Sequence, residues 1–196
     1  LPGLYLVWVG GWPIFVVGSA SLLFAVAYTG GPFPLAYYGL GDLFVFLFFG
    51  LVAVGGTVWV QARSFGPEVL LAGAGMGALN TAILVVNNLR DLETDARAGK
   101  WTMAVWLGHD GSKFELLFLA FLGFGAPLVG MVFYDWTSWV LLSFGAAIPL
   151  LGPARAIAGY APGDDPGTLI PPLGATARAV GLYGLLLGLG LALGSG

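Results

Sequence analysis

Apolar residues fill most of the chain in long blocks, which short polar or glycine-rich breaks separate. The blocks cover residues 14–28, 43–61, 68–89, 114–134, 136–158 and 175–193. A helix needs about 20 mostly apolar residues to cross a membrane, and most of the blocks reach that length. We therefore predict about six complete membrane spans, preceded by a short apolar stub at residues 4–9.

The composition supports this prediction. Of the 196 residues, 58% are hydrophobic and only 9% are charged, whereas about a quarter of the residues of a soluble domain are charged. We predict an all-α polytopic membrane protein in which residues 1–196 form a single transmembrane domain, with membrane lipid as its surroundings.

The charge and the cysteine count exclude several kinds of site. The net charge is -3 and no basic patch is visible, so nucleic acid is not an expected partner. The absence of cysteine excludes disulfides, iron-sulfur clusters and thiolate zinc sites.

The most polar stretch is residues 87–100, Asn-Asn-Leu-Arg-Asp-Leu-Glu-Thr-Asp-Ala-Arg-Ala-Gly-Lys, which directly follows an apolar block. At about 3.6 residues per turn, Asn87, Asp91 and Asp95 fall on one face of a helix. Two carboxylates one turn apart repel each other unless a cation lies between them, and a divalent ion that also binds phosphate oxygens is the usual solution. The spacing predicts that Asp91 and Asp95 are metal ligands.

The cationic residues near the same turns indicate which ligand would bind together with the metal. Arg90, Arg97 and Lys100 can donate charge-assisted hydrogen bonds to the oxygens of a diphosphate. The alternative is an ordinary salt-bridged helix end. We favour a functional site because polar groups next to a membrane-length segment are costly. Gly99 is predicted to end the helix.

The residues that carry a family resemblance are Asn87-Asn88-Leu89-Arg90-Asp91 with Asp95, Gly99-Lys100, Thr102, Ala104-Val105 and Leu107-Gly108. They resemble the second aspartate-rich motif of the UbiA superfamily of intramembrane aromatic prenyltransferases. Further matches are Tyr28-Thr29-Gly30-Gly31-Pro32, Tyr38-Gly39-Leu40-Gly41, the following Phe-rich helix and Ala175-Thr176-Ala177-Arg178. The pattern is most similar to the MenA branch, and it implies the C-terminal two thirds of a UbiA-type transmembrane helix bundle.

The resemblance implies a reaction and its substrates. A polyprenyl diphosphate would lose its diphosphate with the help of Mg²⁺ held by Asp91 and Asp95, and of the cations Arg90 and Lys100. The allylic cation would then attack 1,4-dihydroxy-2-naphthoate, which loses its carboxylate, in menaquinone (vitamin K2) biosynthesis.

Four further residues are expected around these substrates. Asn87 and Asn88 would be hydrogen-bonding partners of the metal site or the diphosphate, and Tyr28 would be a wall of the acceptor pocket. Gln61 is either a substrate contact or an interhelical hydrogen-bond partner.

One element of the superfamily pattern is missing. UbiA enzymes carry a first aspartate-rich motif between early helices, and no such motif occurs in this sequence. Leu1 is not an initiator residue, so we expect an N-terminally truncated fragment with little or no activity by itself.

The cations predict the orientation. Alternate loops place Arg63 on one side and the other six cations on the opposite side, namely Arg90, Arg97, Lys100, Lys113, Arg155 and Arg178. By the positive-inside rule the second side is cytoplasmic. It also holds the loop at 28–41, the acidic helix end and the loop at 159–168, so the expected active site faces the cytoplasm of a bacterial plasma membrane.

Other functions stay open. Another aromatic acceptor, 4-hydroxybenzoate or homogentisate, is possible within the superfamily. A membrane transporter would also explain the helices, although acids at one helix end suit a headgroup site better. A CDP-alcohol phosphotransferase would need an Asp-Gly-x-x-Ala-Arg signature, which is absent.

Overall fold

The structure is a computed structural model that describes residues 2–30 and 34–194. Every regular element in these ranges is helical, which confirms the predicted all-α class. Residues 31–33, part of the predicted loop at 28–41, lie outside the described residues. The elements are α1 (Pro2–Gly10), α2 (Trp12–Thr29), η1 (Leu35–Tyr38), α3 (Gly41–Val45), η2 (Phe46–Val52), α4 (Ala53–Ala62), α5 (Pro67–Arg97), α6 (Met103–Phe133), η3 (Ser138–Leu150), α7 (Leu151–Gly159), η4 (Pro166–Leu169) and α8 (Ile170–Gly194).

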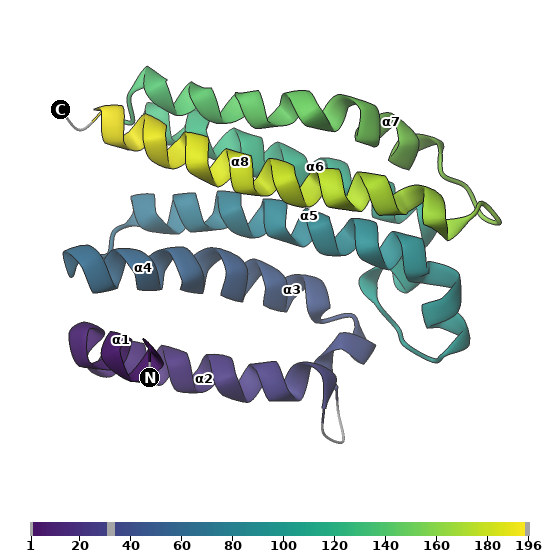
Figure 1. The fold of residues 1–196 in the computed structure, drawn as a ribbon, viewed down its shortest axis with the longest axis horizontal. Helices are drawn as coiled ribbons and strands as arrows, with labels where there is room; N and C mark the ends of the chain where they lie inside the picture. Colours follow the sequence, from purple (N-terminus) through teal and green to yellow (C-terminus); the bar gives the residue numbers. More distant parts are fainter. Residues whose placement is uncertain (1, 31–33, 195–196) are drawn as a thin grey trace.

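Five helical stretches are long and apolar enough to cross a membrane, and they run side by side in Figure 1. They are Gly41–Ala62, Pro67–Arg97, Met103–Phe133, Ser138–Gly159 and Pro166–Gly194. The remaining predicted span corresponds to α2, whose apolar part, Trp12–Tyr28, is shorter. The chain is therefore an integral multi-pass membrane protein.

Helix α5 is the centre of the bundle. Within its most apolar stretch 56% of the residues are buried, compared with 11 to 28% in the other four spans. Its glycines allow the neighbouring span to approach closely, because a Cβ on Gly50 would lie 2.5 Å from the Cα of Gly77 and 2.5 Å from the carbonyl oxygen of Gly73. Gly73 and Gly77 thus form a helix-packing surface of the kind that small residues provide in membrane proteins.

The span at 41–62 contains a segment of π-helix, Phe46–Val52, between α3 and α4. Such segments insert a wider turn into an α-helix and frequently occur near functional sites. Gly50 lies in this segment, so the contact with α5 and the change of helix type coincide.

The span of α6 begins earlier than the apolar pattern predicted, at Met103 instead of residue 114. Thr102 caps its first turn by accepting a hydrogen bond from the Val105 nitrogen at 3.3 Å. Gly108 interrupts the helix with a φ of 69°, a conformation that glycine adopts easily. The first turn of α6 therefore turns away from the long axis of the helix.

Three polar loops meet at one end of the bundle, the right-hand end in Figure 1. The Trp101 nitrogen donates to the Tyr37 carbonyl oxygen at 3.0 Å, and the Gly163 nitrogen donates to Glu93 Oε1 at 3.2 Å. The predicted grouping of the loops at 28–41 and 159–168 with the acidic end of α5 is thus confirmed. The loops after α1, α4 and α6 lie at the other end.

Candidate functional site

The polar run forms the last three turns of α5, which continues through Asp95 to Arg97. Gly99 follows with a φ of 71°, and the Lys100 nitrogen donates to the Asp95 carbonyl oxygen at 2.9 Å. The left-handed glycine turns the chain back so that Lys100 lies beside the helix it has just left. The predicted helix end at Gly99 is confirmed.

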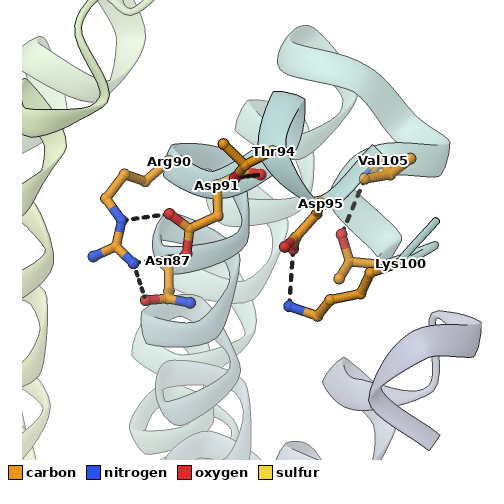
Figure 2. A network of polar contacts seen from close by, with 8 residues as sticks. Asn87, Arg90, Asp91, Thr94, Asp95, Lys100 and Val105 are labelled. Atoms are coloured by element: carbon orange, nitrogen blue, oxygen red, sulfur yellow. Dashed lines mark hydrogen bonds and ion pairs between the residues drawn. The ribbon is translucent and has the colours of Figure 1, made fainter. Parts of the chain in front are cut away.

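Asp95 and Lys100 form an ion pair across this turn. Lys100 Nζ lies 2.9 Å from Asp95 Oδ2, and the two side chains are 25% and 13% exposed, respectively. Asp91 lies one turn earlier and pairs with Arg90, whose Nε and Nη2 donate to Oδ1 and Oδ2 at 2.8 and 2.7 Å. Figure 2 shows the two acids directed to separate cations.

The asparagines connect these pairs to the rest of the site. Arg90 Nη2 also donates to Asn87 Oδ1 at 3.0 Å, so Asn87, Arg90 and Asp91 form one network (Figure 2). Asn88 is buried. The amide of an asparagine has an NH₂ group that can donate to phosphate oxygens and a carbonyl oxygen that can accept hydrogen bonds or bind a cation.

The donor set fits a magnesium ion that shares its ligands with a substrate. Mg²⁺ is usually bound by one or two carboxylates, with substrate phosphate oxygens and water completing the coordination. Asp91 and Asp95 supply two carboxylates. No cluster of three or more acids or histidines close enough to hold a metal occurs within residues 2–30 and 34–194. Asp91 and Asp95 each pair with a cation here, so by residue type they could hold a metal only if its remaining ligands came from elsewhere.

A cavity of about 510 Å³ opens beside the end of α5. Five of the predicted site residues line it, namely Tyr28, Asn87, Asn88, Asp95 and Lys100. Arg90 and Asp91 do not line it. Arg90 donates to Asn87, which does, and Asp91 is connected to the cavity only through Arg90. The fold thus brings Tyr28 of α2 to the polar run of α5, across about sixty residues of sequence.

Gln61 lies elsewhere. Its side chain is exposed in the last turn of α4, at the opposite end of the bundle from Asp95 (Figure 1). It borders a separate hollow of about 290 Å³ together with Leu6 and Ile14. The structure does not bring Gln61 to the cavity at the end of α5.

Asp42 lines the same cavity, and the sequence analysis did not select it. An acid in the first turn of a helix is usually a simple stabiliser of the helix dipole, and Asp42 occupies that position in α3. In the fold it is only 6% exposed. The signal that could have revealed it is an isolated acid at the entrance of a Phe-rich membrane span.

Tyr160 fixes the third loop against the site. It is buried among Val86, Leu89 and Leu169, and its ring stacks on His109 with 5.7 Å between centroids. Burial raises the pKa of the Tyr160 hydroxyl, and the nearby carboxylate of Glu93 raises it further. The hydroxyl therefore stays neutral beside the acidic end of α5.

Comparison with known proteins gives a consistent result. The UbiA prenyltransferase family model matches residues 1–170. Proteins named 1,4-dihydroxy-2-naphthoate octaprenyltransferase are similar to the chain in Haemophilus influenzae (39% identity over 91% of this chain), Mycobacterium tuberculosis (37% over 92%) and Bacillus subtilis (30% over 97%). The alignments cover 57%, 60% and 60% of those relatives, so the chain spans less than two thirds of their length. No solved structure matches significantly.

Proposed function

The chain belongs to the UbiA prenyltransferase family, and from this premise we propose that it transfers a polyprenyl chain from an allylic polyprenyl diphosphate to 1,4-dihydroxy-2-naphthoate in menaquinone biosynthesis. Three relatives at 30% identity or more carry the name of this activity. Their acceptor favours dihydroxynaphthoate over 4-hydroxybenzoate and homogentisate.

The observation that carries the proposal is the junction of a polar cavity with an apolar one. Tyr28 lines the polar cavity and also a hollow of about 630 Å³ whose other walls include Phe24, Phe44 and Phe48. A polyprenyl diphosphate has the same two parts, a charged head and a long apolar tail. The charged head would bind in the polar cavity beside Lys100, and the apolar tail would lie in the hollow between α2 and the span at 41–62.

The residues at the end of α5 would bind the diphosphate head. Asp91 and Asp95 would hold Mg²⁺, which when bound neutralises the negative charge that develops on the leaving diphosphate. Arg90 and Lys100 now donate to carboxylate oxygens, and diphosphate oxygens are acceptors of the same kind. Asn87 and Asn88 would complete the hydrogen bonds to the head.

The proposed orientation places this site on the cytoplasmic side of a bacterial plasma membrane. Arg90, Arg97 and Lys100 belong to the end of the bundle where the three polar loops meet, whereas Arg63 lies at the other end. The positive-inside rule assigns the cation-rich end to the cytoplasm. A diphosphate from the cytoplasm would then reach the cavity without crossing the membrane.

The test is binding of farnesyl S-thiolodiphosphate, which ionises poorly, to the chain in lipid nanodiscs by calorimetry. We expect Mg²⁺-dependent binding that Asp91→Asn or Asp95→Asn weakens about tenfold or more, because a charged ligand contact is lost. Asp110→Asn is the matched control, since its carboxylate is fully exposed and 3.7 Å from Lys113. Binding that is equal without Mg²⁺ and in all variants would refute the proposal.

A further inference from the structure

Asp42 is a buried carboxylate whose side-chain oxygens have no hydrogen-bond partner among the described residues. Both of its side-chain oxygens are buried, and neither has a partner within the described part of the chain. A buried charge without a partner costs several kcal/mol in general, and buried polar groups are nearly always paired. An atom outside the described residues is therefore needed to satisfy Asp42.

The backbone around Asp42 is held firmly in place. Thr81 of α5 donates its hydroxyl to the Gly77 carbonyl oxygen at 2.8 Å and lies 3.4 Å from the Asp42 carbonyl oxygen. The preceding residue, Gly41, packs closely against its neighbours, because a Cβ there would lie 3.0 Å from the Tyr28 hydroxyl and 3.4 Å from Leu84. Asp42 is thus fixed between α2 and α5.

The cavity decides which group Asp42 can meet. Asp42 shares it with Asp95 and Lys100, and its other lining residues include Tyr28, Tyr37 and Leu84. Aromatic and apolar walls suit a flat ring. The volume of about 510 Å³ is in the usual range for a small-molecule site, roughly 300 to 1,000 Å³.

A metal ion is a weaker explanation for Asp42 than a hydroxyl group. Asp42 does not join Asp91 and Asp95 in a three-acid group, since the residues that the structure describes contain no such group. A ring hydroxyl needs one acceptor only, and its bond to a carboxylate is of the strong, charge-assisted kind. The observations therefore favour a hydroxyl donor on an aromatic ring.

We propose that Asp42 accepts a hydrogen bond from a ring hydroxyl of the aromatic acceptor and so selects hydroxylated rings. This inference rests on the proposed prenyl transfer and assigns the acceptor side of the same site. The bond orients the ring between Tyr28 and the end of α5, and it increases the electron density of the ring that attacks the allylic carbon. A site built around such a bond discriminates strongly against a ring without the hydroxyl.

The experiment compares two probes that differ only in their hydroxyl groups, 1,4-dihydroxy-2-naphthoic acid and 2-naphthoic acid. Both carry the carboxylate, so its repulsion by Asp42 affects both equally. Binding is measured by titration to the full chain in lipid nanodiscs. The variants are Asp42→Leu, which keeps the approximate shape but removes the acceptor, and Glu115→Gln, which is the control.

Glu115 is a stringent control because it is a second buried acid, close enough to Asp42 for the two charges to interact, that does not line the proposed site. Its Oε2 atom, in the membrane span of α6, is also buried and has no hydrogen-bond partner in the part of the chain that the structure describes. It does not line the cavity that Asp42 lines. Glu115→Gln therefore removes a buried charge near Asp42 but keeps every residue that lines the cavity, so it separates a general charge effect from the loss of the proposed acceptor.

We expect the unchanged chain to prefer the dihydroxy probe about tenfold or more, as the loss of a charged hydrogen bond predicts. Asp42→Leu should abolish this preference, because only the dihydroxy probe loses a hydrogen bond, and the loss of the repulsion between carboxylates should raise the affinity for 2-naphthoic acid or leave it unchanged. Glu115→Gln should keep the preference. The melting temperature of Asp42→Leu should equal or exceed that of the unchanged chain, because a buried unpaired charge has been removed. A purely structural role of Asp42 would lower it.

The failures of the two proposals are distinguishable. If the unchanged chain binds farnesyl S-thiolodiphosphate and prefers the dihydroxy probe, and Asp42→Leu keeps that preference, the role of Asp42 is wrong while the proposed function stands. If Asp42→Leu loses only the Mg²⁺-dependent diphosphate binding, Asp42 belongs to the metal side and the inference is overturned. If the unchanged chain binds neither substrate probe, the proposed function fails and the inference fails with it.

Discussion

Replacing Lys100 by methionine tests the proposed head-group site most directly. The substitution removes the ammonium group and keeps an unbranched side chain of similar length. In the structure Lys100 Nζ lies 2.9 Å from Asp95 Oδ2, and the two side chains are 25% and 13% exposed. The variant therefore leaves a carboxylate at the edge of the cavity without its cation.

The magnitude follows from the geometry. A hydrogen bond to a charged group contributes about 1.5 to 3 kcal/mol, and about 1.4 kcal/mol corresponds to a tenfold change in affinity. We therefore expect Lys100→Met to weaken the binding of farnesyl S-thiolodiphosphate by about tenfold to a hundredfold. The partial exposure of Lys100 places the expected effect at the lower end, because solvent screens the interaction.

Lys113→Met is the matched control. Lys113 pairs with Asp110 at 3.7 Å, and the Asp110 side chain is fully exposed. Exposed pairs of this kind contribute about 0 to 1 kcal/mol, so diphosphate binding should change less than threefold or so. Calorimetry at fixed Mg²⁺ and ionic strength measures both variants, because salt weakens surface electrostatics.

The outcome that contradicts the reasoning is equal binding by Lys100→Met and Lys113→Met. In that case the ion pair at the end of α5 would be an ordinary salt-bridged helix end. A double variant adds information, since Asp95→Asn combined with Lys100→Met should lose less than the sum of the two single effects if the side chains interact.

Two further predictions concern packing and pH. Gly77→Ala should lower the melting temperature by several degrees, because its Cβ would lie 2.6 Å from the Phe46 carbonyl oxygen. Gly181→Ala is the control and should leave the melting temperature unchanged or raise it, because nothing lies within 4 Å of its Cβ. Fluorescence-detected thermal unfolding in detergent compares the two variants. The pKa of Tyr160 is raised above 10.0, first by burial and then by Glu93, so its stabilising effect is complete below about pH 10 and is lost as the pH rises toward the folded-state pKa. The melting temperature should therefore fall more between about pH 9 and 11 in the unchanged chain than in Tyr160→Phe, and equal slopes would contradict the prediction.

The helical architecture followed from the sequence because a membrane leaves few solutions. Backbone groups in lipid must be satisfied within the segment, so a long apolar block has to be helical. The block at 68–89 accordingly lies inside α5, and the block at 114–134 ends one residue beyond α6, with boundaries that differ where polar turns extend a helix. The apolar pattern did not predict the start of α6 at Met103, because the kink at Gly108 separates a short first turn from the apolar stretch that follows.

The end of α5 was also accessible from the sequence, since its residues are neighbours along one helix. The spacing of Asp91 and Asp95 depends only on the helical repeat, and Gly99 ends the helix through a local backbone conformation. Gln61 shows the limit of such reasoning. It is polar and borders a membrane span like the site residues, yet it lies at the other end of the bundle.

The sequence by itself determined the helices, the acidic turn and the family, because each depends on periodicity or on a contiguous motif. Only the tertiary structure decided that Tyr28 and Asp42 line the same cavity as Asp95 and Lys100. Those contacts depend on the close approach of the span at 41–62 to α5 at Gly50 and Gly77. Burial of a carboxylate without a partner is a property of that packing, and no local pattern in the chain specifies it.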